Sequence, residues 1–229
     1  MHGGAGSVTY CKIDICGEEV TSPQELANLR RFLQPFTNAE HLHLESPRLG
    51  FGLDKDVHTR LPVFFNLHHL ELRGRLPDDD DDTAVAAMIW VLEHAPNLET
   101  ISLVFHSHGY GKYFGDGSMS SSLRSIFGYN EEELLDAHHL RYNRHAIVEA
   151  PSGVPVIPPC LRSRVRKMNL VHYQGGTAQR TLAKLLLCNA SAMEELWCDF
   201  AEGPLWTQTQ LMREIKGWVV NKRAKTHFS

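Results

Sequence analysis

Apolar residues recur along this chain in a pattern that predicts one short strand, used several times. The segments 36–44, 64–72 and 95–103 share the spacing L-x-x-L-x-L, and looser copies lie at 10–15, 165–170 and 193–198. Alternation of apolar and polar residues favours a strand with one buried face. The central apolar positions of the six copies are Ile13, Leu42, Leu70, Ile101, Met168 and Leu196.

The spacing of these positions indicates a repeat architecture. They lie 29, 28, 31, 67 and 28 residues apart, so a period of 28 to 31 residues holds except across one long gap. This period lies at the upper edge of the leucine-rich-repeat range of roughly 20–29 residues. Since one unit cannot bury its strand and helix alone, neighbouring units must stack. The predicted fold is α/β, a short irregular leucine-rich-repeat solenoid with parallel strands on the concave face and helices outside.

Several segments between the strands have helical signals. Ser22 and Glu25 have capping-box spacing before a helix that ends near Pro35, and Thr83 could cap a helix over 84–93. Further helices are expected at 177–188 and 207–222, and Trp206 and Trp218 are expected to close that end of the array. Two cysteines, Cys188 and Cys198, occupy positions that the repeat predicts to be apolar and are expected in the core.

The long gap predicts an insertion. Residues 106–122 are rich in glycine and serine and predict a surface loop, and four prolines in 150–159 predict an extended connector. Leu134 to Tyr142 fits either another repeat centred on Leu140 or a short helix, which the acidic residues 131–133 favour. The predicted organisation is about four leucine-rich repeats in 1–105, a loop-rich insertion in 106–159, and C-terminal repeats with a cap in 160–229.

Composition narrows the class of protein. The longest apolar run, 84–92, is far shorter than the roughly 20 residues of a membrane-spanning helix, so no membrane is expected as a partner. Five cysteines without a CxxC pair favour a reducing compartment, the cytoplasm or the nucleus. The net charge of −4 is uneven: residues 1–160 carry 12 basic and 22 acidic side chains, whereas residues 161–229 carry 11 and 5.

The sequence contains no complete motif for catalysis or for binding a metal, a dinucleotide or nucleic acid. The pair His106 and His108 could begin a metal site, but further ligands at suitable spacing are missing, and five aspartates at 78–82 read as a solvated loop because they lack calcium-loop spacing. The glycines around Gly109 do not form a dinucleotide fingerprint. The basic stretch 162–167 has no interleaved aromatic residues, so nucleic acid is not expected as a partner. No catalytic residue, metal or cofactor is predicted, and a metal-dependent hydrolase using 106–145 is the less favoured alternative.

The polar positions of the predicted strands form the candidate site. They mix both charges with imidazoles and one indole, a composition suited to contact with a polypeptide. The competing interpretation is that they are ordinary solvated strand residues, as Lys12, Asp14, Thr100 and Ser102 in the same rows would be. The candidate partner-binding residues are His41, His43, Glu45, His69, Glu71, Arg73, Lys167, Asn169, Glu195, Trp197 and Asp199.

The segments 160–190 and 200–206 resemble the terminal region of plant, especially grass, F-box proteins with leucine-rich repeats and an FBD-type end, and 73–80 and 92–103 are similar to the same group. In that family an N-terminal F-box recruits the adaptor subunit of a cullin-based ubiquitin ligase, and the repeats are thought to present the substrate. The resemblance implies a non-catalytic protein-recognition module whose last part, 160–229, ends in an FBD-like cap.

This chain departs from the family pattern in two respects. No F-box motif precedes the repeats, so binding to the ligase adaptor is not supported by any residue here, and a truncated family product without independent function is the alternative. The asparagine that usually follows the repeat strand is also replaced, which predicts irregular turns. The residues in its place are Pro47, Arg75, His106 and Tyr173.

Overall fold

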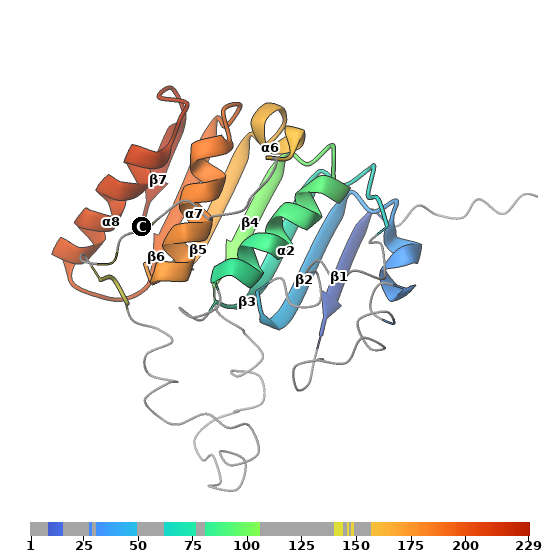
Figure 1. The fold of residues 1–229 in the computed structure, drawn as a ribbon, viewed down its shortest axis with the longest axis horizontal. Helices are drawn as coiled ribbons and strands as arrows, with labels where there is room; N and C mark the ends of the chain where they lie inside the picture. Colours follow the sequence, from blue (N-terminus) through green and yellow to red (C-terminus); the bar gives the residue numbers. More distant parts are fainter. Residues whose placement is uncertain are drawn as a thin grey trace, which may run out of the picture.

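The computed structural model describes residues 9–15, 28, 31–49, 62–76, 81–105, 140–143, 146, 148 and 157–229. They form an α/β protein with one seven-stranded sheet, in which every strand is parallel to its neighbour and the strand order follows the chain order. Figure 1 shows this order running across the molecule. The strands are β1 (Tyr10–Asp14), β2 (His41–Arg48), β3 (His69–Arg75), β4 (Thr100–Val104), β5 (Lys167–Tyr173), β6 (Glu195–Phe200) and β7 (Lys225–Phe228).

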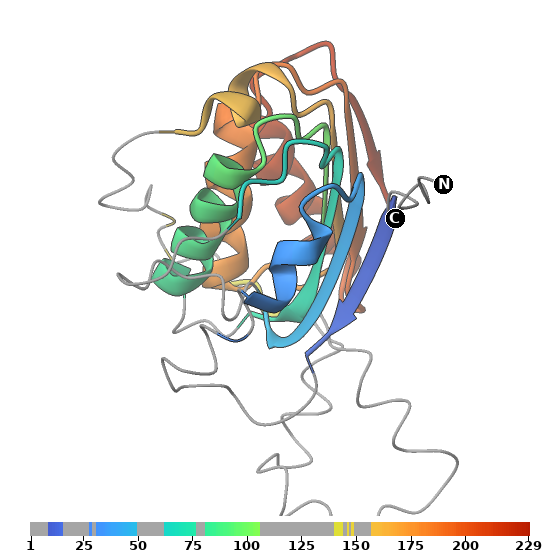
Figure 2. The ribbon, with the colours of Figure 1, turned by 90° about the vertical axis from the view of Figure 1, so that its right-hand side faces the viewer.

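The helices lie between the strands in sequence and together on one face of the sheet in space. Figure 2 shows them as one layer beside the sheet, and no described helix lies against the opposite face. We call that opposite side the open face. The helical elements are η1 (Gln34–Phe36), α2 (Asp81–His94), α6 (Pro159–Ser163), α7 (Thr177–Asn189) and α8 (Leu205–Trp218).

The core lies between the sheet and the helix layer, and it consists of the apolar positions that define the repeat. The ladder aligns the five predicted centres from β2 to β6, which confirms their register and leaves each at most 6% exposed. The first unit was predicted two residues out of register, because Cys11 and not Ile13 pairs with Leu42. A shift of two keeps a side chain on the same face of a strand, so Ile13 is still buried. The aligned centres are Leu42, Leu70, Ile101, Met168 and Leu196.

A repeated turn precedes four of the strands. In each, a backbone N–H donates to the carbonyl three residues earlier: Ala39 to Phe36, Leu67 to Phe64, Leu98 to Ala95 and Met193 to Ala190, at 2.9 to 3.3 Å. The equivalent residue before β5, Val165, donates instead to Cys160, five residues earlier. The units therefore share one local geometry, and the chain that follows the insertion enters the sheet by a different turn.

Two predicted element boundaries were wrong. Helix α2 begins at Asp81, so Asp81 and Asp82 are helical and not part of a loop. Acidic residues are favoured in the first turn of a helix by its macrodipole, a preference that the prediction from the sequence did not apply to these two positions. Helix α8 ends at Trp218, and a seventh strand follows, so β7 forms the edge of the sheet where a helical cap was expected. Trp206 is 62% exposed, whereas Trp218 is partly buried against the core.

No strand of the insertion lies between β4 and β5. Strand β4 pairs directly with β5, so a further repeat centred on Leu140 does not exist between them. The segment 140–143 instead lies at the carboxyl ends of β5 and β6: the Leu140 N–H donates to the Glu202 carbonyl at 2.9 Å, and the Arg141 N–H donates to the Gln174 carbonyl at 2.8 Å. The predicted loop at 106–122, residues 150–156 of the predicted connector at 150–159, and the pair His106 and His108 lie outside the described residues. The last residue of that connector, Pro159, is helical and begins α6.

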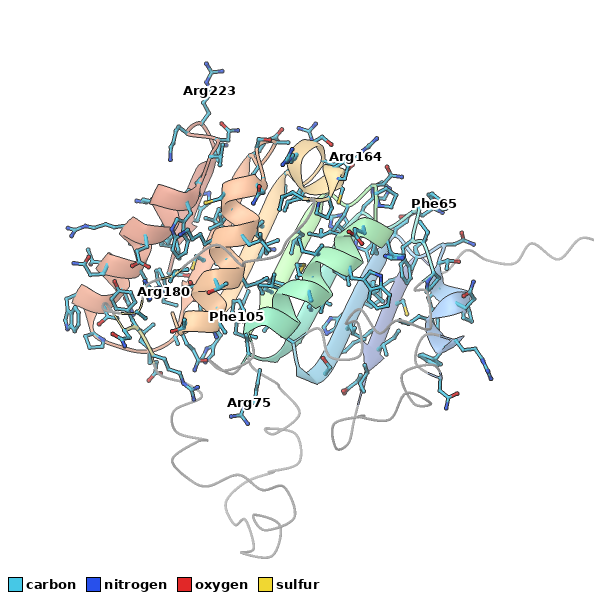
Figure 3. The ribbon with its side chains drawn as sticks, viewed as in Figure 1. Phe65, Arg75, Phe105, Arg164, Arg180 and Arg223 are labelled. Atoms are coloured by element: carbon cyan, nitrogen blue, oxygen red, sulfur yellow. The ribbon has the colours of Figure 1, made fainter. Side chains whose placement is uncertain are left out.

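A buried arginine attaches this segment to the helix layer. Arg180 of α7, only 4% exposed, donates through Nε and Nη2 to the carboxylate of Glu214 of α8 at 3.0 and 2.9 Å. It also donates to the carbonyls of Asn143 and Ala146 at 3.1 and 3.3 Å, and the Tyr142 hydroxyl donates to Glu214 at 3.0 Å. Figure 3 shows Arg180 between the two helices and the returning chain.

The carboxyl ends of the strands are irregular, in agreement with the missing asparagines. The register shifts between Glu45 and Arg48 and again between Leu170 and Tyr173. Within the second shift His172 has a φ of 58°, a left-handed conformation that is uncommon for a residue other than glycine. Tyr173, at one of the positions where asparagine was missing, is fully buried against Phe105 and Phe200.

Two further observations concern expectations about burial and membranes. Cys198 is buried in the core as predicted, but Cys188 is exposed on α7, because that helix turns only part of its surface toward the sheet. Among the described residues no helix combines the length and the apolar character needed to cross a membrane.

Candidate protein-binding surface

The open face of the sheet carries the predicted polar residues in rows that cross the strands. The ladder places His41 beside His69, and His69 beside Thr100, with Lys167 and Glu195 following in the same row. All eleven candidate residues belong to strands β2, β3, β5 and β6. The next row toward the carboxyl ends contains Lys12, His43, Glu71, Ser102, Asn169, Trp197 and His227.

On β2 and β3 these residues are bonded mostly to one another. His43 is 6% exposed, and its Nδ1 lies 3.2 Å from the Glu71 carboxylate, while its Nε2 lies 3.9 Å from the carboxylate of Glu45, which is also 6% exposed. Arg73 donates from Nε to the same Glu71 oxygen. The His43 Nε2 has no hydrogen-bond partner among the described residues. This cluster therefore offers a partner little accessible polar surface.

Burial also lowers the pKa of two histidines here. Desolvation lowers the pKa of His43, although the neighbouring carboxylate of Glu71 acts in the opposite direction. Desolvation and the adjacent His41 ring lower the pKa of His69. The rings of His41 and His69 are parallel within 3° at 4.2 Å, and Tyr10 of β1 lies 6.4 Å beyond His41. From Tyr10 to His69 this row is therefore an aromatic surface.

On β5 and β6 the face includes the exposed side chains of Lys167 and Trp197, whereas Asn169, Glu195 and His227 of β7 are partly buried. Trp197 is 51% exposed, and its ring stacks on the His227 ring at 4.1 Å and 15°. The Trp197 indole donates to Glu195, which lowers the pKa of that carboxyl. Glu195 lies 3.5 Å from Lys167 and 3.7 Å from His227. Exposed aromatic rings beside charged groups are typical of the residues that carry binding energy at protein interfaces.

Three residues of this surface, Tyr10, Lys225 and His227, were not predicted from the sequence. Tyr10, 59% exposed, was missed because the first repeat was aligned two residues out of register. Lys225 and His227 were missed because a four-residue strand gives little periodic signal. The repeat itself offered a clue, since Thr226 pairs with Leu196 and follows it by 30 residues, within the period of the earlier units.

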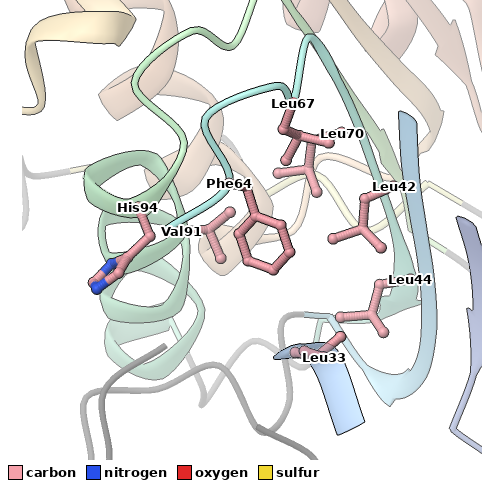
Figure 4. A pocket seen from close by; sticks show the side chains of 8 residues that line it. All are labelled: Leu33, Leu42, Leu44, Phe64, Leu67, Leu70, Val91 and His94. Carbon is pink, nitrogen blue, oxygen red and sulfur yellow. The ribbon is translucent and has the colours of Figure 1, made fainter. Parts of the chain in front are cut away.

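One hollow among the described residues lies inside the core and not on this face. This cavity of about 10 Å³ lies between β2, β3, η1 and α2 and is lined by apolar side chains around Phe64, with His94 at its rim (Figure 4). Its size is roughly that of one water-sized sphere, so it is a packing defect rather than a ligand site. No group of three potential metal ligands occurs among the described residues.

Comparison with known proteins adds no relative. No family model, no curated protein and no solved structure matches this chain. The functional argument therefore depends on the surface itself and on the resemblance noted in the sequence.

Proposed function

We propose that this protein is a non-catalytic recognition module that binds another protein on the open face of its sheet. The proposal also assigns it to the leucine-rich-repeat solenoids, with the open face as the concave side, and takes its role to resemble that of the substrate-binding part of an F-box subunit of a ubiquitin ligase. The observation that carries it is the exposed pair of Trp197 and His227 on a sheet face that no described helix covers.

Physical chemistry favours a partner over solvent at this position. A stacked indole and imidazole bury little area against their own chain and present a rigid apolar surface beside polar groups. Trp197 projects from the middle of β6, where neighbouring strands fix its backbone on both sides. Rigid aromatic residues on a regular element lose little conformational entropy when a partner covers them.

Affinity capture with paired variants tests the proposal. The full chain, Trp197→Ala and Trp206→Ala would be used as baits in an extract of the organism's own cells, with quantitative mass spectrometry of the captured proteins. Trp206 is the matched control, because it is similarly exposed, at 62%, but belongs to α8 in the helix layer. We expect a set of proteins that the Trp197→Ala bait loses and the Trp206→Ala bait retains.

Two results would count against the proposal. One is capture of no specific protein by the unmodified chain while control baits capture theirs. The other is equal loss with both tryptophan variants, which would place binding on the helix layer or show a general effect. If the chain captures a ligase adaptor and Trp197→Ala does not reduce that capture, the adaptor binds at a place other than the Trp197 surface.

A further inference from the structure

Between the two aromatic stacks lies a strip of the open face over β4 and β5, which we call the trough. Parallel rings about one strand spacing apart must stack along the direction that crosses the strands, so the rings stand up from the sheet like walls. His69 of β3 forms one wall and Trp197 of β6 forms the other. The floor between them carries the short side chains of Thr100, Ser102 and Asn169. The longer side chain of Lys167 lies at its amino end, 3.5 Å from Glu195.

The dimensions of this trough suit one polypeptide segment. Three strand spacings of about 4.8 Å separate β3 from β6, and the thickness of the two rings leaves roughly 11 Å between the walls. This width accommodates a single helix of about 10–12 Å diameter or one extended chain.

The amino end of the trough opens at a strongly basic rim. The loops and strand starts that precede β5 and β7 contain seven cations and lie beside one another, because the Glu194 N–H donates to the Arg166 carbonyl and the Lys225 N–H donates to the Glu194 carbonyl. Figure 3 shows Arg164 and Arg223 at this edge of the sheet. The seven cations are Arg162, Arg164, Arg166, Lys167, Lys222, Arg223 and Lys225.

Part of this charge has no counterpart in the described chain. Arg166 is bonded to Glu194, Lys167 lies 3.5 Å from Glu195, and Lys222 donates to the carbonyl of Val219 at 2.6 Å. The four other rim cations are exposed, and within the described ranges none has a side-chain partner. They are Arg162, Arg164, Arg223 and Lys225.

The same edge has the opposite character in front of the earlier strands. There the positions equivalent to Arg166 are Glu40, His68 and Glu99, and His68 lies 3.6 Å from Glu99. Among the described residues of this edge, unpaired positive charge therefore lies in front of β5 to β7 and not in front of β2 to β4. Complementary charge on a partner would raise the rate of association and set its direction along the trough.

We infer that the partner of this surface inserts a single acidic polypeptide segment into the trough between His69 and Trp197, with its carboxylates on the basic rim. This inference rests on the proposed function and adds the chemistry of the partner. A protein segment fits better than nucleic acid, because Glu194 and Glu195 interrupt the rim cations. Phosphates recur at a fixed spacing and would be repelled there, whereas an acidic peptide can place uncharged residues opposite these two carboxylates.

Selection from a random twelve-residue peptide library displayed on phage, with the full chain as target, provides the test. We expect the enriched peptides to carry clustered Asp and Glu with at least one apolar residue. One enriched peptide, labelled with fluorescein, would then be titrated by fluorescence anisotropy. The double variant Arg164→Glu/Arg223→Glu should weaken its binding at least about tenfold, and binding should weaken as salt is raised.

Matched variants keep the outcomes distinct. Arg31→Glu/Arg213→Glu makes the same change of net charge on exposed residues of the helix layer and should weaken binding less than about twofold, whereas Trp197→Ala should weaken it about tenfold or more.

Peptides that need Trp197 but show no acidic bias would overturn the inference and leave the proposed function standing. Failure of Trp197→Ala to weaken any enriched peptide would overturn both. Tighter binding of a twenty-residue oligothymidine or of vesicles with anionic headgroups than of the acidic peptide would overturn the inference in favour of those ligands.

Discussion

Strands β1 to β3 and strands β5 to β7 place polar side chains at the same positions of one sheet face, but the two groups differ in burial and pairing. In the first group His43 and Glu45 are 6% exposed, and Glu71 serves both His43 and Arg73. In the second, Trp197 is 51% exposed and the Lys167 side chain 60% exposed. Equivalent repeat positions can therefore stabilise the face at one end and remain available at the other, so position in the repeat alone does not identify a binding residue.

The largest expected effect concerns the attachment of the returning chain beside β5 and β6. Replacing Arg180 by Met should lower the free energy of unfolding by about 3 kcal/mol, because the Glu214 carboxylate and two carbonyls lose a buried partner. Urea denaturation measures it. The control Arg166→Met breaks an exposed pair and should cost about 0.5 kcal/mol or less. Equal losses in the two variants would show that burial is not what distinguishes them.

Thiol labelling should show that local stability differs between strand β1 and strand β6. Cys11 and Cys198 are both buried, and burial raises the pKa of each thiol, but Cys11 lies on an edge strand whereas β6 has a neighbour on each side. Because edge strands open locally at lower cost, we expect Cys11 to react with a maleimide at least about tenfold faster. The background should carry Cys16→Ser, Cys160→Ser and Cys188→Ser. Faster labelling of Cys198 would mean that β6 is the less stable region.

Charge removal should affect the two polar groups unequally. Glu71→Gln keeps the shape of the side chain but removes the charge that His43 and Arg73 face, and should cost about 1 kcal/mol of folding free energy in urea denaturation. Glu195→Gln should lower the urea midpoint less, because the partners of its carboxylate are more distant. This carboxylate lies 3.5 and 3.7 Å from Lys167 and His227, farther than the Glu71 carboxylate lies from His43 and Arg73. The comparison fails if Glu195→Gln proves the more destabilising change.

Lowering the pH should destabilise the folded protein through His43 and His69, which lie on β2 and β3. The pKa values of His43 and His69 lie below their ordinary value of 6.5 in the folded protein, so the unfolded chain takes up protons first as pH falls. Stability is therefore fully present above about pH 6.5 and decreases below it, levelling off below the folded-state pKa values. Urea midpoints measured between pH 7.5 and 5.5 should decrease less in His43→Gln/His69→Gln than in the unmodified chain or in Trp206→Ala. An identical slope in all three would assign the acid sensitivity elsewhere.

The resemblance to F-box proteins stays a prediction, and with it the cytoplasmic or nuclear location and the absence of catalysis. The prediction of strand positions had a stronger basis than the prediction of function, because apolar alternation with a fixed period indicates directly which side chains are buried. That signal placed five strands of the sheet and helix α7 nearly to the residue. It was weaker at the edges of the sheet, where β1 and β7 have only one neighbour and fewer apolar positions.

By itself the sequence therefore determined the stacking unit, the buried rows and which residues share the open face, since these follow from the periodicity of a strand and from the hydrophobic effect. Only the tertiary structure decided which of those residues a partner can reach. Exposure of His43 or Trp197 depends on side chains contributed by neighbouring strands, and these lie 28 to 31 residues away in the sequence except across the insertion. The unpaired cations at the amino end of the trough likewise come together only in the folded chain, because the turns before β5 and β7 are far apart in the sequence.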